Sequence, residues 1–91
     1  MIEIRLEENR NRAAAYDGEK EAGECTYQVR DGKWVIDHTF TDPAYGGQGI
    51  AGKMVQCIAE AAQEKNVIIV PVCSYAAHWF SKHPEYRTEQ I

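Results

Sequence analysis

Four glycines lie within seven residues in the middle of the chain, at positions 46, 47, 49 and 52, and Lys53 follows directly. Glycine allows a backbone to approach a ligand closely because it has no Cβ. The first amide N–H groups of a helix have no intrahelical partner, so a glycine loop that leads into a helix offers free donors to an anion. The alternative is a turn that merely connects two elements. So many glycines at a strand-to-helix junction favour an anion site.

The segment Gly47–Gly52 also matches two phosphate-binding patterns. It is a literal G-x-G-x-x-G, but a dinucleotide site needs an acidic residue about 20 positions later, where this chain has Val72-Cys73-Ser74. A P-loop needs Ser or Thr after its lysine to hold magnesium, and position 54 is Met54. We therefore expect neither a nicotinamide or flavin dinucleotide nor phosphoryl transfer.

Two other side chains are candidates for acid–base or nucleophilic chemistry. Imidazole readily takes and gives protons near neutral pH, so His38 is a candidate general base, the alternative being a histidine held within the sheet. Cys73 follows an apolar run and Pro71, and its thiol is a candidate for acylation, the alternative being a small buried hydrophobe. Cys25 and Cys57 have apolar neighbours and are predicted to be core residues.

Length and charge limit the class of protein. Ninety-one residues predict a single domain over 1–91, and a formal charge of −4 favours a cationic partner over nucleic acid or an anionic membrane. The longest apolar run, 67–73, is far shorter than the ~20 residues of a membrane span, and residues 1–8 do not resemble a signal peptide. The three cysteines form no C-x-x-C pair, so we expect no metal site and a cytoplasmic protein with reduced thiols.

The first half of the chain has the pattern of an antiparallel meander. Apolar and charged residues alternate near the N-terminus, as in a half-buried strand. Asp17-Gly18 and Asp31-Gly32 are typical of hairpin turns that need positive φ. Four strands are therefore predicted before any helix, within residues 1–8, 12–16, 21–30 and 33–41.

The two-residue period of a strand gives the fourth strand two distinct faces. This period predicts that His38 shares a face with Trp34, Ile36 and Phe40. Thr39 and its alternate neighbours are predicted to lie on the other face.

The second half predicts a helix, a buried strand and a closing helix. Apolar residues recur at helical spacing over 50–65, and Asn66 is a plausible stop. The apolar run 67–70 is typical of a strand covered on both faces, and its order after the helix implies a right-handed parallel crossover. Pro71 has no N–H, so pairing is expected to weaken there and leave a gap that admits a ligand. A short helix over 75–82 closes the chain.

This order of elements resembles the GNAT superfamily of acyl-CoA N-acyltransferases over nearly the whole chain. In that family the loop before the long helix carries Arg/Gln-x-x-Gly-x-Gly/Ala, whose amides hold the pyrophosphate of coenzyme A, and Gly49-Ile50-Ala51 matches its end. The resemblance implies an α/β (α+β) fold, in which a mixed, mostly antiparallel sheet carries a central amphipathic helix and a short C-terminal helix.

The chain departs from the family pattern in several places, including Glu85-Tyr86 where the family ends in Gly-Phe. Gly46 stands where the pattern has Arg or Gln, and Ser81 stands at the position of the usual tyrosine acid. The helices that normally follow the first strand are missing. The chain is similar to a small, bacterial-type subgroup that shares His38, a Pro-x-Cys ending in Cys73 and a closing His83-Pro84-Glu85-Tyr86.

The resemblance implies acetyl-CoA as the acetyl donor and an amine, on a small molecule or a protein, as the acceptor. It places the thioester between the fourth and fifth strands, near Phe40, Thr41, Val72 and Cys73. Cys73 would carry the acetyl group and His38 would activate the thiol or the amine, with direct attack by the amine as the alternative route. The acidic composition favours a cationic amine. The predicted cofactor-binding residues are Phe40, Thr41, Tyr45, Gly46, Gly47, Gln48, Gly49, Ile50, Ala51, Gly52, Lys53, Ser74, Lys82 and His83.

Two non-enzymatic readings stay open. One is a coenzyme A-binding or protein-interaction module without transfer activity, suggested by the missing loop side chain and the missing tyrosine. The other is an adaptor that binds a peptide at an exposed sheet edge. The sequence is compatible with a monomer or a weak dimer.

Overall fold

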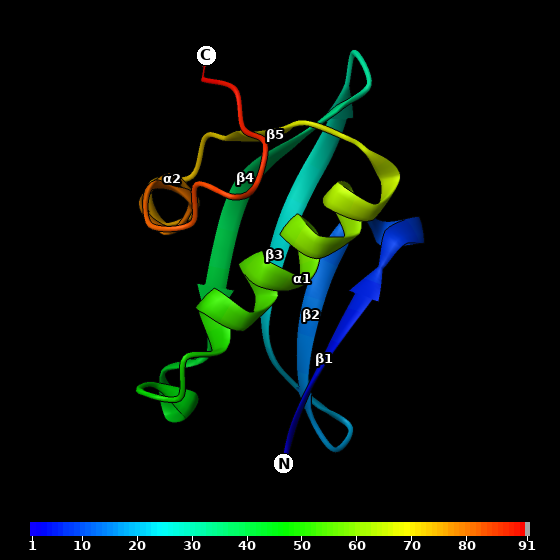
Figure 1. Ribbon diagram of the computed structural model, residues 1–91. Helices are drawn as coiled ribbons and strands as arrows, with labels where there is room; N and C mark the ends of the chain where they lie inside the picture. Colours follow the sequence, from blue (N-terminus) through cyan, green and yellow to red (C-terminus); the bar gives the residue numbers. More distant parts are fainter. Residues whose placement is uncertain (91) are drawn as a thin grey trace.

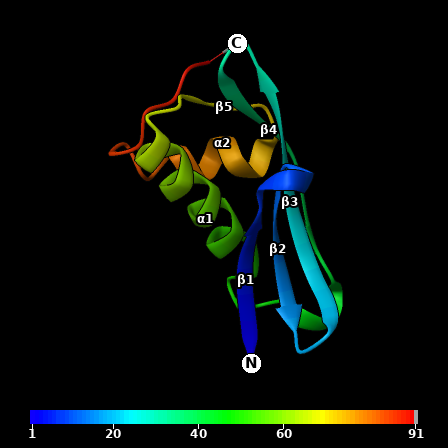
Figure 2. The same cartoon turned by 90° about the vertical axis from the view of Figure 1, so that its right-hand side faces the viewer.

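The computed structural model describes residues 1–90, so the last residue of the domain predicted over 1–91 lies outside the described residues. One five-stranded sheet carries two helices on the same face, as Figures 1 and 2 show. The strands follow the order β1-β2-β3-β4-β5, antiparallel except for the parallel pair β4–β5. This arrangement confirms the predicted mixed, mostly antiparallel α+β fold. The elements are β1 (Ile2–Glu7), β2 (Arg12–Asp17), β3 (Lys20–Arg30), β4 (Lys33–Thr41), α1 (Ile50–Lys65), β5 (Ile69–Pro71) and α2 (Ser74–Ser81), with short 3-10 turns at Glu8–Arg10 and Pro43–Tyr45.

Backbone conformation explains where the elements begin and end. Gly18 has a φ of 64° in the first hairpin, and Asp31 and Gly32 have φ of 52° and 75° in the second, as turns between twisted antiparallel strands require. Asn66 adopts the left-handed conformation after α1 and its N–H bonds back to that helix, which confirms the predicted stop. Strand β5 begins two residues later than the apolar run predicts and includes Pro71.

The core lies between α1 and the sheet. Three alanines of β2 are fully buried, and two of them, Ala13 and Ala15, face the helix, so α1 packs closely against the strands. Met54 and Ile58 fill the space from the helix side. Cys25 is fully buried and Cys57 is half-buried against the core, which confirms that both pack as predicted.

A β-bulge in β4 changes which side chains face the core. Thr26 of β3 pairs with His38, but its neighbour Tyr27 pairs with Ile36, so Asp37 has no partner opposite it. The strand therefore loses its two-residue alternation at this point. Trp34 and Ile36 are buried under the helices as predicted, whereas His38 and Phe40 are exposed. The prediction that His38 shares a face with Trp34 and Ile36 is wrong. The extra residue in β4 shifts the alternation, so the His38 side chain points to the face opposite the helices.

Glycine at position 23 is required by the close approach of the neighbouring strand β4 and of Met54 on α1. A Cβ at this position would lie 2.7 Å from the carbonyl oxygen of Phe40 and 3.2 Å from the Met54 side chain. We expect Gly23→Ala to lower the free energy of unfolding by about 1–3 kcal/mol, the usual cost of overpacking, as measured by urea unfolding. Gly52→Ala is the control, because there the nearest atom is the far end of the Tyr75 side chain and alanine favours a helix. Equal stability of Gly23→Ala and the parent would contradict this close approach.

The sheet face opposite the helices holds a buried arginine. The side chain of Arg12 is only 6% exposed, and its guanidinium donates to Glu7, Glu21 and Glu24 over 2.7, 2.8 and 2.8 Å. The Tyr16 hydroxyl and Arg12 hold the pKa of Glu7 below its usual range. These groups join three neighbouring strands in one network.

Removing Arg12 is expected to weaken the fold and change its response to acid. Arg12→Met should lower the free energy of unfolding by roughly 2 kcal/mol, less than for a fully buried pair because Glu21 is half exposed. A carboxyl whose folded pKa is lowered stabilises the protein above its unfolded pKa, about 4.3 for Glu, and this contribution disappears as pH falls through the folded pKa. Urea unfolding between pH 7 and 3 should therefore show a smaller acid loss in Arg12→Met than in the parent. Parallel pH profiles would contradict this role of Arg12.

Candidate active site

Strands β4 and β5 separate after a short paired stretch. The last registered pair is Ile36 with Pro71, and the amides of Val72 and Cys73 both donate to the Ile36 carbonyl oxygen over 3.0 Å. In the described part of the chain, β4 then continues to Thr41 with no strand paired on this side. The predicted loss of pairing at Pro71 is confirmed. The unpaired stretch of β4 beside Cys73 is called below the opening between β4 and β5.

Cys73 occupies the N-cap position of α2, at the point where the strands part. Its sulfur is half-buried and lies 3.4 Å from the Thr39 hydroxyl of β4. Burial raises the pKa of the Cys73 thiol, but the Thr39 hydroxyl and the backbone amides of Ala76 and Tyr75 lower it by more. The net pKa is below the ordinary value, which increases the fraction of reactive thiolate.

His38 lies on the opposite face of the sheet. Its side chain is 57% exposed, and its Nε2 atom is 4.0 Å from Glu24. Thr39, the next residue, faces Cys73, and successive side chains of a strand point to opposite faces. The structure thus brings Thr39 rather than His38 to the Cys73 sulfur. Sequence reasoning missed Thr39 because no local signal marks the bulge at Asp37.

The glycine loop forms a second part of the candidate site, at the N-terminus of α1. Gly47 and Gly49 have φ of 80° and 71°, and Gly49 is the N-cap residue, which has no side chain to satisfy the first amides of the 16-residue helix. A shallow cavity of about 160 Å³ lies here. It is lined by Thr41, Tyr45, Gly46, Gly47, Gly49, Ile50, Ala51 and Tyr75.

The polar groups of this cavity suit a ligand with anionic and hydrogen-bonding parts. The Thr41 hydroxyl is buried and has no hydrogen-bond partner in the described residues. The Tyr45 hydroxyl donates to Asp17 over 2.8 Å and so fixes the loop to the end of β2. Tyr75 comes from α2 and was not among the predicted cofactor-binding residues. A side chain of α2 therefore joins the loop residues on the rim of the cavity.

The other predicted cofactor residues are more scattered. Gln48 is exposed within the loop, Gly52 and the exposed Lys53 lie in the first turn of α1, and Ser74 begins α2. Lys53 lines a separate hollow beside Cys57 and not the loop cavity. Phe40 is 51% exposed on the helix-free face. Lys82 and His83 follow the C-terminal end of α2, where the His83 ring stacks on Trp79 at 3.7 Å, and neither residue lines the loop cavity.

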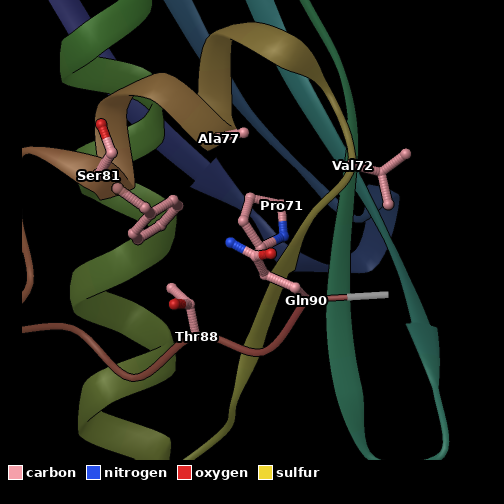
Figure 3. Close-up of a pocket in the computed structure, with 7 residues that line it drawn as sticks. Pro71, Val72, Ala77, Ser81, Thr88 and Gln90 are labelled. Carbon is pink, nitrogen blue, oxygen red and sulfur yellow. The ribbon is translucent and has the colours of Figure 1, made fainter.

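A larger cavity of about 420 Å³ lies between the end of β5, α2 and the C-terminal segment (Figure 3). Pro71 and Val72 form its β5 side, Ala77, Phe80 and Ser81 its α2 side, and Thr88 and Gln90 its third side. Val72 is the only lining residue that the sequence analysis placed near the reacting carbon. Residues 1–90 contain no group of three or more potential metal ligands and no helix long and apolar enough to cross a membrane.

The architecture is that of known acetyltransferases. A solution structure from Staphylococcus aureus, of a protein assigned to the GCN5-like N-acetyltransferases, is 30% identical, covers 98% of this chain and 89% of its own, and has a TM-score of 0.74. A ribosomal-protein-alanine N-acetyltransferase from Brucella melitensis biovar Abortus is 18% identical, with 82% of this chain and 62% of its own covered and a TM-score of 0.60. A predicted acetyltransferase with acetyl-CoA from Clostridium acetobutylicum is 19% identical, with 84% of this chain and 58% of its own covered and a TM-score of 0.59. The fold is therefore that of the N-acetyltransferases.

A family model then identifies the chain more closely. The model of the GCN5-related N-acetyltransferases matches residues 12–89, which is most of the sequence. The chain belongs to the GCN5-related N-acetyltransferase family, as its resemblance to the GNAT superfamily predicted. No curated protein matches the chain.

Proposed function

We propose that this protein transfers an acetyl group from acetyl-CoA to an amine through an acetyl-Cys73 intermediate. The observation that carries the proposal is the position of the Cys73 sulfur, half-buried where β4 and β5 separate and with a lowered pKa. A thiolate at such an opening can reach a carbonyl carbon held between the strands.

The residues of the glycine loop support acetyl-CoA as the donor. The free amides at the start of α1 suit the pyrophosphate, and no atom lies within 4 Å of the place of a Cβ at Gly47 or Gly49, so a ligand can approach the backbone there. The buried Thr41 hydroxyl lacks a partner and lines the same cavity, so it is available to a polar group of the ligand. Gly46 contributes no side chain, so backbone donors and the exposed Lys53 carry the phosphate contacts in this proposal.

The chemistry divides into two acyl transfers. In the first, the Cys73 thiolate attacks the thioester carbon, the bond to the coenzyme A sulfur breaks, and that sulfur leaves as a thiol after taking a proton from solvent. In the second, the neutral nitrogen of the amine attacks acetyl-Cys73 and the bond between the acetyl carbon and the Cys73 sulfur breaks. The amide forms as the nitrogen loses a proton to solvent, and the Cys73 thiolate is released.

His38 has a separate role in this scheme. His38 lies on the other face of the sheet from Cys73, so it takes a proton from an ammonium acceptor before the neutral amine reaches acetyl-Cys73. Glu24, 4.0 Å away, stabilises the imidazolium that results. The net charge of −4 also favours a cationic acceptor, on a small molecule or a protein.

Thermal unfolding with and without acetyl-CoA tests donor binding. A ligand that binds only the folded state at a hundredfold excess over its Kd stabilises it by about 2.7 kcal/mol. We expect this stabilisation with acetyl-CoA and with coenzyme A, followed by release of free coenzyme A when amines are added. No stabilisation at millimolar acetyl-CoA would contradict the proposal. Stabilisation without acetyl transfer to any amine would favour a binding module.

A further inference from the structure

The hydroxyl of Thr39 lies between two cysteine sulfurs. It donates to Cys25 Sγ over 3.7 Å and is 3.4 Å from Cys73 Sγ, where either atom can be the donor. Thr39 and Cys25 are also directly paired across β4 and β3. The three side chains thus form a hydrogen-bonded chain that runs from the core to the opening between β4 and β5.

The protons of this chain can be arranged in two ways. A hydroxyl has one hydrogen, so Thr39 can donate to only one sulfur at a time. While Cys73 is a thiol, its S–H donates to Thr39 and the Thr39 O–H donates to Cys25. When Cys73 loses its proton to solvent, a hydrogen bond to the thiolate requires that the Thr39 O–H turns toward it, and the Cys25 S–H then donates to the Thr39 oxygen.

Burial suits Cys25 to the second arrangement. It is fully buried, and burial raises its pKa to about 12, so it keeps its hydrogen at every pH at which the protein would work. It can therefore donate to Thr39 without competing with Cys73 for the negative charge. Cys57, in contrast, has no hydrogen bond to Thr39 and lies on α1.

We propose that Thr39 is a positioning residue that holds and stabilises the Cys73 thiolate, and that the buried Cys25 thiol orients the Thr39 hydroxyl for this role. The proposal rests on the proposed function, in which Cys73 is the nucleophile. It concerns the protonation of the sulfur itself, so it can be measured without cofactor or acceptor. The bulge at Asp37 is necessary for this role of Thr39, since in a regular strand the Thr39 side chain would point away from Cys73.

The test is the pH dependence of Cys73 alkylation by iodoacetamide, read by mass spectrometry of the modified peptide. Hydrogen bonds to charged groups are strong enough to move a pKa by about one unit. Thr39→Val, which keeps the shape of the side chain, should shift the midpoint of alkylation upward by about one pH unit, so that alkylation below the midpoint slows about tenfold. Thr39→Ser keeps the hydroxyl and should restore the parent midpoint. Cys25→Ala should give a smaller upward shift than Thr39→Val.

Each comparison has an outcome that overturns part of the proposal. An unchanged midpoint in Thr39→Val removes the role of Thr39, and an equal shift in Thr39→Ser assigns the effect to packing instead of the hydroxyl. A parent midpoint in Cys25→Ala removes the role of Cys25. At each pH, alkylation of Cys57 should be the same in every variant as in the parent, and so reports on the fold. If Thr39→Val shifts the midpoint but the parent protein never accepts an acetyl group, the proposed function fails and this inference stands.

Discussion

Cys73→Ala is expected to abolish covalent acetylation of the protein and to slow release of coenzyme A by on the order of a hundredfold or more, as removal of a nucleophile does. The reason is that Cys73 is the one cysteine at the opening between β4 and β5, where its pKa is lowered, whereas burial raises the pKa of Cys25 and of Cys57. The measurement is the rate of coenzyme A release from acetyl-CoA in the presence of an amine acceptor. The released coenzyme A is detected through the reaction of its free thiol with a thiol reagent.

Cys57→Ala is the matched control, since Cys57 is also half-buried but lies on α1. It should keep the parent rate. If Cys73→Ala also keeps that rate, the acetyl group passes directly to the amine and the covalent route is wrong. Thermal unfolding with acetyl-CoA should be unaffected by either substitution, which separates loss of chemistry from loss of binding.

A negative charge in the glycine loop should have the second large effect. Gly49→Asp is expected to weaken binding of acetyl-CoA roughly tenfold or more, because a carboxylate close to a pyrophosphate repels it by at least about 1 kcal/mol even in water. Position 49 has open space around it, and Asp is accepted both at a helix N-cap and at a left-handed φ. The fold itself should therefore tolerate the change. Isothermal titration with coenzyme A measures the loss.

Two controls isolate the charge from the backbone. Gly49→Asn introduces a side chain of almost the same shape without charge and should retain most of the affinity. Gly18→Asp adds the same charge at a left-handed glycine in the β2–β3 hairpin and should leave affinity unchanged. Equal affinity in Gly49→Asp and Gly49→Asn would mean that the phosphates bind elsewhere.

Local patterns were enough to predict most of the fold. The alternation at the N-terminus, the turn pairs Asp17-Gly18 and Asp31-Gly32, and the helical spacing over 50–65 each depend on residues close in sequence. Pro71 predicted the end of pairing between β4 and β5, because proline has no N–H to donate to a neighbouring strand and this property is read from the sequence alone. The glycine loop was found for the same reason, since glycine content and the start of a helix are both local.

The arrangement around Cys73 depends on contacts that no local pattern reveals. One unpaired residue, Asp37, turns His38 outward and Thr39 inward, and its place is set by pairing with β3. Tyr75 joins the glycine loop only because α2 crosses the sheet beside α1. The burial of Arg12 also depends on distant contacts. Arginine is ordinarily exposed, and here carboxylates of β1 and β3 surround it.

The most direct test is the intact mass of the parent protein mixed with acetyl-CoA in the absence of an amine. We expect one added acetyl group per chain, located on the peptide that contains Cys73 and removed by hydroxylamine, as a thioester is. Addition of an amine should discharge it and return the protein to its original mass. A protein that binds acetyl-CoA, acetylates amines and never carries an acetyl group on Cys73 would contradict the acetyl-Cys73 intermediate.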